Sequence, residues 1–260
     1  MDFVVAIPTY NRHKTILKQT LKFLELNGID KENILIFVKD GFQFQKYMQV
    51  GLNDYKFVFT GQDGIKNTRN FLQEFFYFNN THGDFVLYLD DDINELVQGL
   101  QERPVRNLVD ILAEMAEKMY QTGYNICGIA PYNNGFYLQP KKTDYTTTLK
   151  YICGGFRFEY IRRDLPLLKC SMGQFEDQQF NCEYFLRDGG VLRNNTIGIQ
   201  TDHFQPEGGI TEQVGGYDAR QKLMHSNMGL MKGLYGDMVL LKKKKWGYDV
   251  ALNRHFKLSS

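Results

Sequence analysis

The sequence predicts an α/β protein built on a doubly wound, mainly parallel sheet. Three short apolar runs, Phe3–Ile7, Ile34–Val38 and Tyr55–Phe59, are typical of buried strands and alternate with segments of helical periodicity. A fourth run, Asp84–Leu89, leads directly into the acidic triplet Asp90-Asp91-Asp92. Because parallel strands need crossover connections, this alternation favours a nucleotide-binding type of sheet.

The helices follow from apolar spacing and stop signals. Lys14–Asn27 carries leucines on one helical stripe and is followed by Gly28, a short helix runs through Met48, and Ile65–Phe78 precedes the fourth strand. After the triplet, a helix containing Leu108 ends at Gly123. We therefore expect three strand–helix units in succession, followed by a fourth helix.

The second half has a different pattern. Ile126–Ala130 returns to the sheet, and residues 132–158 form short segments separated by glycine and aromatic residues. Gln174–Leu186 is predicted to be helical and Val191–Gln200 to be a strand. The tail from Gly208 is glycine-rich, then helical, then basic.

Composition places the chain among ordinary globular proteins. Its 260 residues suffice for one compact unit, and 31 basic against 30 acidic residues leave no overall charge bias. We expect no signal peptide, no membrane helix and a cytoplasmic location, or the host cytoplasm if the gene is phage-borne. The four cysteines lack CxxC spacing and are expected to be reduced.

The acidic triplet suggests a cation site. Carboxylates at the C-terminal end of a buried strand lie where open α/β sheets bind ligands, and hard oxygen ligands favour Mg²⁺ or Mn²⁺. The alternative is a solvated loop or a helix cap.

Further sequence motifs indicate a protein family. Pro8-Thr9-Tyr10-Asn11-Arg12 ends the first strand, Asp40 follows the second, and Gly64–Asn70 precedes the triplet. Together with Asp90-x-Asp92 and Glu176-Asp177, their order resembles that of the family-2-like glycosyltransferases of GT-A fold. The resemblance covers roughly residues 3 to 180. It implies one GT-A domain, residues 1–260, with a nucleotide-sugar-binding half (1–130) and an acceptor-binding half (131–260).

The resemblance also implies a donor site. A nucleoside-diphosphate sugar, expected to be a UDP-sugar, would bind together with Mn²⁺ or Mg²⁺ against the Pro8–Arg12 motif. Asp40 would contact the base of the nucleotide. Asp92 would ligate the metal directly, Asp90 would contact ribose or reach the metal through water, and Asp91 would point away or cap the next turn. Lys66 and Arg69, at a helix start, are candidates for phosphate contacts. The alternative for Arg69 is an ion pair with a carboxylate at the sheet edge.

Two further site predictions lie in the second half. Asp177 is predicted to be the general base of an inverting transfer, with Glu176 orienting it or binding acceptor. The alternative is that both residues occupy the negative first turn of a helix. His203, which follows a strand, is a candidate for a further metal ligand.

The acceptor is the least determined feature. Lys242-Lys243-Lys244-Lys245 with Trp246 is either a solvated face or a patch that follows the phosphates of duplex DNA. A weaker resemblance to phage-type DNA base glycosyltransferases favours hydroxymethylated DNA bases. A cell-surface or capsular glycan is the alternative acceptor, and a metal-dependent nuclease or phosphodiesterase is the alternative enzyme.

Overall fold

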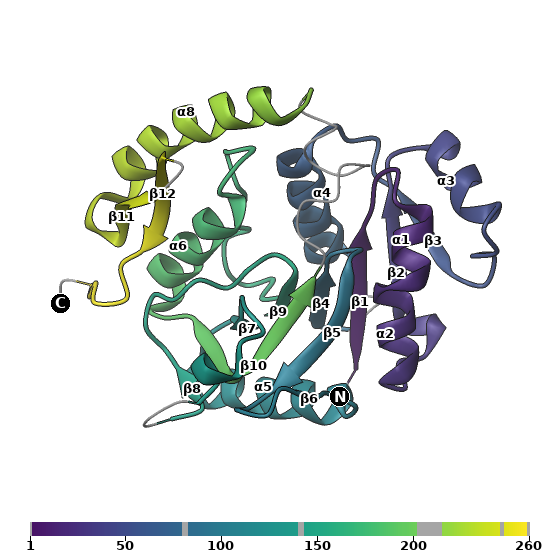
Figure 1. Ribbon diagram of the computed structural model, residues 1–260, viewed down its shortest axis with the longest axis horizontal. Coiled ribbons are helices and arrows are strands. Elements are labelled where there is room, and N and C mark those ends of the chain that lie inside the picture. Colours follow the sequence, from purple (N-terminus) through teal and green to yellow (C-terminus); the bar gives the residue numbers. More distant parts are fainter. Residues whose placement is uncertain (1, 80–82, 140–142, 202–214, 245–246, 259–260) are drawn as a thin grey trace.

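The computed structural model describes residues 2–79, 83–139, 143–201, 215–244 and 247–258 (Figure 1). Within these ranges, ten strands form one sheet in the order β3-β2-β1-β4-β9-β7-β10-β5-β6, with β8 paired to β10. The strands are β1 (Phe3–Pro8), β2 (Ile34–Val38), β3 (Lys56–Phe59), β4 (Phe85–Leu89), β5 (Ile93–Gln98), β6 (Arg103–Pro104), β7 (Ile126–Ala130), β8 (Tyr145–Thr146), β9 (Phe156–Tyr160) and β10 (Leu192–Thr201).

The helices cover both faces of the sheet. They are α1 (His13–Lys18), α2 (Thr20–Leu26), α3 (Gly41–Met48), α4 (Ile65–Phe78), α5 (Leu108–Thr122), α6 (Glu176–Asp188) and α8 (Tyr217–Tyr235). Val5 and Ile7 of β1 share a core with α2 and α5, whereas Val4 and Ala6 pack with α4 on the opposite face. This two-sided burial of one strand gives the predicted layered α/β architecture.

The sheet is parallel only in its first half. β3, β2, β1 and β4 are parallel neighbours, as the strand–helix alternation predicts. β9 lies antiparallel between β4 and β7, and β10 pairs in parallel with β7 but antiparallel with β5. The short segments after residue 132 thus contribute an inserted strand, and strands of both halves of the chain share one sheet.

The helix expected over Lys14–Asn27 is interrupted at Gln19, whose backbone has φ −114° and ψ −88°. The next residue, Thr20, donates its hydroxyl hydrogen to the carbonyl of Asp90 at 2.8 Å and accepts from the amide of Ile93 at 2.9 Å. The interruption therefore lets one buried hydroxyl hold both ends of the acidic loop.

The last segments form a second layer beyond α6. α8 and the hairpin of β11 (Val239–Lys244) and β12 (Gly247–Leu252) share a core with α6 through Phe180, Met231 and Val250. The basic tail that the sequence predicts is thus largely a hairpin. All four cysteines are free, and none of the described helices has the length and apolarity needed to cross a membrane.

A buried ion pair lies in the middle of the sheet. Arg157 and Glu159 of β9 are almost fully buried, with Nε and Oε1 2.7 Å apart. The guanidinium lies over the rings of Tyr88 and Phe180, and Glu159 accepts from Gln73 Nε2 at 2.8 Å. These contacts join β9 to both α4 and α6.

We expect Glu159→Leu to lower the free energy of unfolding by about 3–5 kcal/mol, because it leaves the Arg157 charge buried without a counter-charge. Urea denaturation measures the change. Glu95→Leu, which removes the partner of the exposed Arg106, is the control and should cost under about 1 kcal/mol after solvent screening. Equal costs for the two variants would contradict the assignment.

Candidate active site

The acidic loop at the end of β4 holds three carboxylates in different environments. The side chain of Asp90 is 41% exposed, whereas Asp91 and Asp92 are buried. The carboxyl ends of the parallel strands β1 and β4 meet at this edge of the sheet. The loop after β1 therefore lies against the triplet.

The Pro8–Arg12 loop contacts both buried carboxylates and compensates part of their charge. Thr9 Oγ1 donates to Asp91 Oδ2 at 2.6 Å and accepts from the hydroxyl of Tyr47, 2.7 Å away. Arg12 Nη1 lies 3.0 Å from both Asp91 Oδ1 and Asp92 Oδ2. Thr9 and Arg12, both predicted to contact the donor, thus hold the acidic loop in place.

The Pro8–Arg12 loop is also hydrogen-bonded to α3. Asn11 has a left-handed backbone (φ 57°), and its side-chain oxygen accepts from Gln43 Nε2 and Lys46 Nζ, both at 2.8 Å. Asp40, the predicted base-binding residue, caps α3 by accepting from the amide of Gln43 at 2.9 Å. Pro8 ends β1, and the partly buried Tyr10 follows it in the loop.

The start of α4 brings a second cation to the triplet. Arg69, whose side chain is 3% exposed, donates to Asp90 Oδ1 at 2.7 Å and lies 3.4 Å from the carbonyl of Gly154. This is the alternative that the sequence left open, an ion pair with a carboxylate at the sheet edge. Lys66, one turn earlier, is partly buried and forms no ion pair with any described residue.

Glu176 and Asp177 occupy the first turn of α6, after Phe175 in a left-handed conformation (φ 65°). Asp177 Oδ2 accepts from the amide of Gly154 at 2.8 Å and from the hydroxyl of Tyr151 at 3.2 Å. Its buried Oδ1 has no hydrogen-bond partner within the described part of the chain. That oxygen therefore keeps unused hydrogen-bond acceptor capacity.

Gly154 and Gly155 lie between the carboxylates of Asp177 and Asp90. A methyl group at Gly154 would lie 2.4 Å from Asp177 Oδ1 and 2.7 Å from Arg69 Nη2, and one at Gly155 would lie 3.4 Å from Asp90 Oδ2. At Gly154, the absence of a side chain lets the backbone pass between the carboxylates. Neither this contact nor the role of Tyr151 is predicted from the sequence, although the glycine doublet directly before an apolar run is a signal for a close backbone approach.

Burial and mutual repulsion raise the pKa values of these acids. Burial, then the charges of Asp90 and Asp91, raises the pKa of Asp92 to about 7. Burial, then Asp177, raises the pKa of Glu176 to about 8, and burial raises that of Asp177 against the attraction of Arg69. The two arginines thus leave negative charge at the site incompletely compensated.

The donor set fits a hard divalent cation. Asp90 and Asp92 supply carboxylate oxygens at the sheet edge, and proton loss from Asp92 would favour metal binding. No group of three or more His, Cys, Asp or Glu side chains suited to a metal occurs among the described residues. Two protein carboxylates suit Mg²⁺ or Mn²⁺, which commonly keep positions for phosphate and water. His203 lies outside the described residues.

No protein-family model and no curated protein sequence matches the chain. Solved structures of glucosyl-3-phosphoglycerate synthase from Mycobacterium tuberculosis do match. The complex with Mn²⁺, UDP and glucosyl-3-phosphoglycerate has a TM-score of 0.53 at 11% identity, covering 97% of this chain and 87% of that chain. The complex with Mn²⁺ and UDP-glucose has a TM-score of 0.53 at 12% identity, covering 96% and 86%.

A crystal structure of S. aureus TarS, residues 1–349, aligns more loosely. Its TM-score is 0.43 at 18% identity, and the match covers 89% of this chain and 66% of that chain. The synthase structures, with TM-scores above 0.5, show that this chain has the GT-A fold predicted from its motifs.

We expect Gly154→Ala to destabilise the site, because the new methyl group would force Asp177 and Arg69 apart. A cost of about 1–3 kcal/mol in the free energy of unfolding is typical of overpacking. Chemical denaturation measures it. The control is Gly233→Ala in α8, which has open space around it and should be stabilised by up to about 1 kcal/mol. An unchanged free energy of unfolding in Gly154→Ala would mean that the backbone at this position is not tightly packed.

Proposed function

We propose that the chain is a metal-dependent glycosyltransferase that moves a sugar from a nucleoside-diphosphate sugar, with UDP-sugar the expected donor, to an acceptor hydroxyl. The observation that carries the proposal is the arrangement of Asp90, Gly154 and Asp177. An accessible carboxylate at the end of β4 and a partly buried carboxylate lie on either side of a glycine backbone. One oxygen of the second carboxylate has no hydrogen-bond partner among the residues that the structure describes. The synthase that shares this fold was crystallised with Mn²⁺ and UDP-glucose.

Asp90 and Asp92 are the residues that would hold Mn²⁺ or Mg²⁺. When bound, the cation supplies positive charge to the diphosphate leaving group. Arg69 positions Asp90 through its ion pair, and Arg12 positions Asp92 in the same way. Thr20 fixes the backbone of the loop, so both carboxylates are oriented before any ligand arrives.

Asp177 is the proposed general base of an inverting transfer. The amide of Gly154 and the hydroxyl of Tyr151 hold one of its oxygens, which leaves the other to accept the proton of the acceptor hydroxyl. The amide of Gly154 and the positive charge of Arg69 favour the ionised form of Asp177, against the effect of burial. Burial and the charge of Asp177 raise the pKa of Glu176.

The alternative reaction, a two-metal nuclease, has less support. Such sites hold two metals about 4 Å apart and draw acidic or histidine ligands from several elements. The described residues contain no such cluster of three. Metal-dependent cleavage of labelled DNA is the measurement that would favour it.

A hydroxymethylated base in duplex DNA is the acceptor suggested by the basic tail. Its support is that Lys242 and Lys243 are exposed on β11. Their side chains, however, point to opposite faces of the hairpin, and Lys242 lies across from Asp249. Lys245 and Trp246 lie outside the described residues. Salt-dependent binding to duplex DNA separates this acceptor from a glycan.

We expect UDP and Mn²⁺ together, but neither alone, to raise the melting temperature, and UDP-glucose to be hydrolysed slowly when Mn²⁺ is present. Asp90→Asn and Asp92→Asn should each lower hydrolysis by at least about a hundredfold, because each removes a charged metal ligand. Asp63→Asn is the control, since Asp63 pairs with Lys39 on the surface. Full activity in both ligand variants would refute the assigned metal site.

We expect Asp177→Asn to keep the stabilisation by UDP and Mn²⁺ while transfer falls by about 10²–10⁴-fold. A base must be ionised and burial raises the pKa of Asp177, so wild-type transfer should rise with pH through that pKa and level off above it. A pH–rate profile measures this, with the exposed Asp110→Asn as the control. A rate that is flat or falls with pH would mean another group takes the proton.

A further inference from the structure

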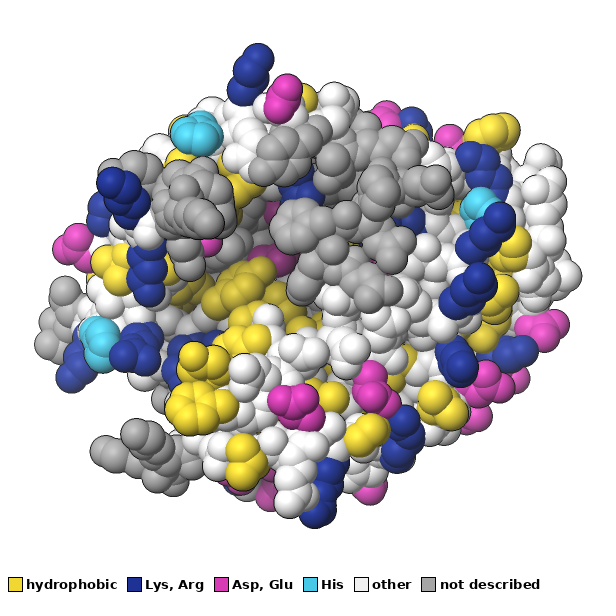
Figure 2. All heavy atoms as spheres, in the orientation of Figure 1, with side chains coloured by type: hydrophobic (Ala, Val, Ile, Leu, Met, Phe, Trp, Pro, Cys, Tyr) yellow, Lys and Arg dark blue, Asp and Glu magenta, His cyan; other side chains and the backbone are white. Residues whose placement is uncertain are grey.

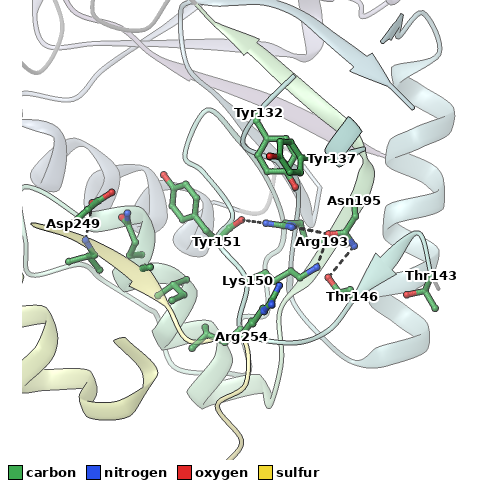
Figure 3. A pocket seen from close by; sticks show the side chains of 15 residues that line it. Tyr132, Tyr137, Thr143, Thr146, Lys150, Tyr151, Arg193, Asn195, Asp249 and Arg254 are labelled. Atoms are coloured by element: carbon green, nitrogen blue, oxygen red, sulfur yellow. Dashed lines mark hydrogen bonds between the residues drawn. The ribbon is translucent and has the colours of Figure 1, made fainter. Parts of the chain in front are cut away.

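A cavity of about 800 Å³ is lined in part by Gln178, the residue that follows the proposed base Asp177 (Figure 3). Its walls come from β10, from β12 and the residues that follow it, and from the segment that precedes Gly154. Tyr151 lines this cavity and also donates its hydroxyl to Asp177. Tyr151 therefore links the cavity wall to the proposed base.

Three cationic side chains face the cavity: Lys150, Arg193 and Arg254. Lys150 Nζ and the Arg193 atoms Nε and Nη2 all donate to one oxygen, Asn195 Oδ1, at 3.0–3.1 Å. An amide oxygen carries no formal charge and cannot neutralise two cations. Within the described part of the chain, none of the three forms an ion pair.

The carboxylate in the wall does not balance this charge. Asp249 lies apart from Lys150 and Arg193 in Figure 3, and its Oδ1 accepts from the amide of Val250 at 2.8 Å. Burial, then the charges of Arg193 and Arg254, lowers the pKa of Lys150 to about 8. Figure 2 shows Lys and Arg side chains gathered near β11, β12 and the C-terminal residues, beside a hollow with hydrophobic side chains. The local excess is positive although the chain is nearly neutral.

We propose that this cavity binds a phosphate group carried by a small acceptor and thereby presents the hydroxyl of that acceptor to Asp177. The inference rests on the proposed function for the role of the acceptor, but binding of phosphate itself does not. Two guanidinium groups and an ammonium can compensate the two charges of a phosphate dianion and donate hydrogen bonds to its oxygens. The cavity volume is that of a small-molecule site.

The test is calorimetric titration of inorganic phosphate into the full-length protein saturated with UDP and Mg²⁺, so that the proposed diphosphate site is occupied. We expect Lys150→Gln and Arg254→Gln each to weaken phosphate binding about tenfold, as for the loss of one charge-assisted hydrogen bond. Lys118→Gln on α5, outside the cavity, is the matched control and should bind phosphate as wild type does. Arg254 is exposed, so its variant tests the site even if Lys150→Gln fails to fold.

Unchanged phosphate affinity in Arg254→Gln would overturn the proposal, as would a wild-type protein that binds UDP and Mg²⁺ but no phosphate. If the protein fails to bind UDP, the proposed glycosyltransferase function is contradicted. Titration of phosphate without nucleotide would then still show whether the cavity binds phosphate. A short DNA duplex forms the second arm. Duplex binding that depends on Lys150 and Arg254, without phosphate binding, would replace the small acceptor with a nucleic acid.

Discussion

Compensation of negative charge at the C-terminal end of β4 is the constraint on which this structure depends. Three consecutive carboxylates there would repel one another and resist burial. Arg12 from the loop after β1 pairs with Asp91 and Asp92, and Arg69 from α4 pairs with Asp90. Each pairing joins the acidic loop to a neighbouring segment, so the same contacts that make burial tolerable also assemble the site.

The two arginines compensate the negative charge only in part. The site therefore has an acidic region, which lies near a second region of positive charge. On the acidic side, Asp92 and Glu176 have pKa values raised to about 7 and about 8, so a cation would relieve repulsion. On the other side, the cavity at Lys150 and Arg193 has positive charge that pairs with no carboxylate among the described residues. Tyr151 contacts both regions, since its hydroxyl binds Asp177 and its carbonyl lies 3.3 Å from Arg193 Nη1. A donor with its metal and an anionic acceptor would thus meet across one short segment.

Local sequence patterns predicted the strands of the parallel half, because β2 and β4 are continuous apolar runs and α4 has clear helical periodicity. They also placed the acidic triplet at a strand end. Three kinds of feature were beyond such patterns. The insertion of β9 between β4 and β7 depends on pairing between distant segments. The ion pair of Arg69 with Asp90 connects residues 21 positions apart. The cations of the cavity come from three separate segments of the chain. Local periodicity carries no information on these partners.

The geometry of Asn195 explains how two like charges remain side by side in the cavity. Its Nδ2 donates to the carbonyl of Asp144 at 3.1 Å and to Thr146 Oγ1 at 3.2 Å, so its Oδ1 must face Lys150 and Arg193. The amide cannot turn without losing these bonds and placing donors against donors. Asn195 lies where the pairing register of β10 with β7 shifts, between Arg193 and Gly198. The irregular strand therefore orients both cations before a ligand arrives, which reduces the entropy cost of binding an anion.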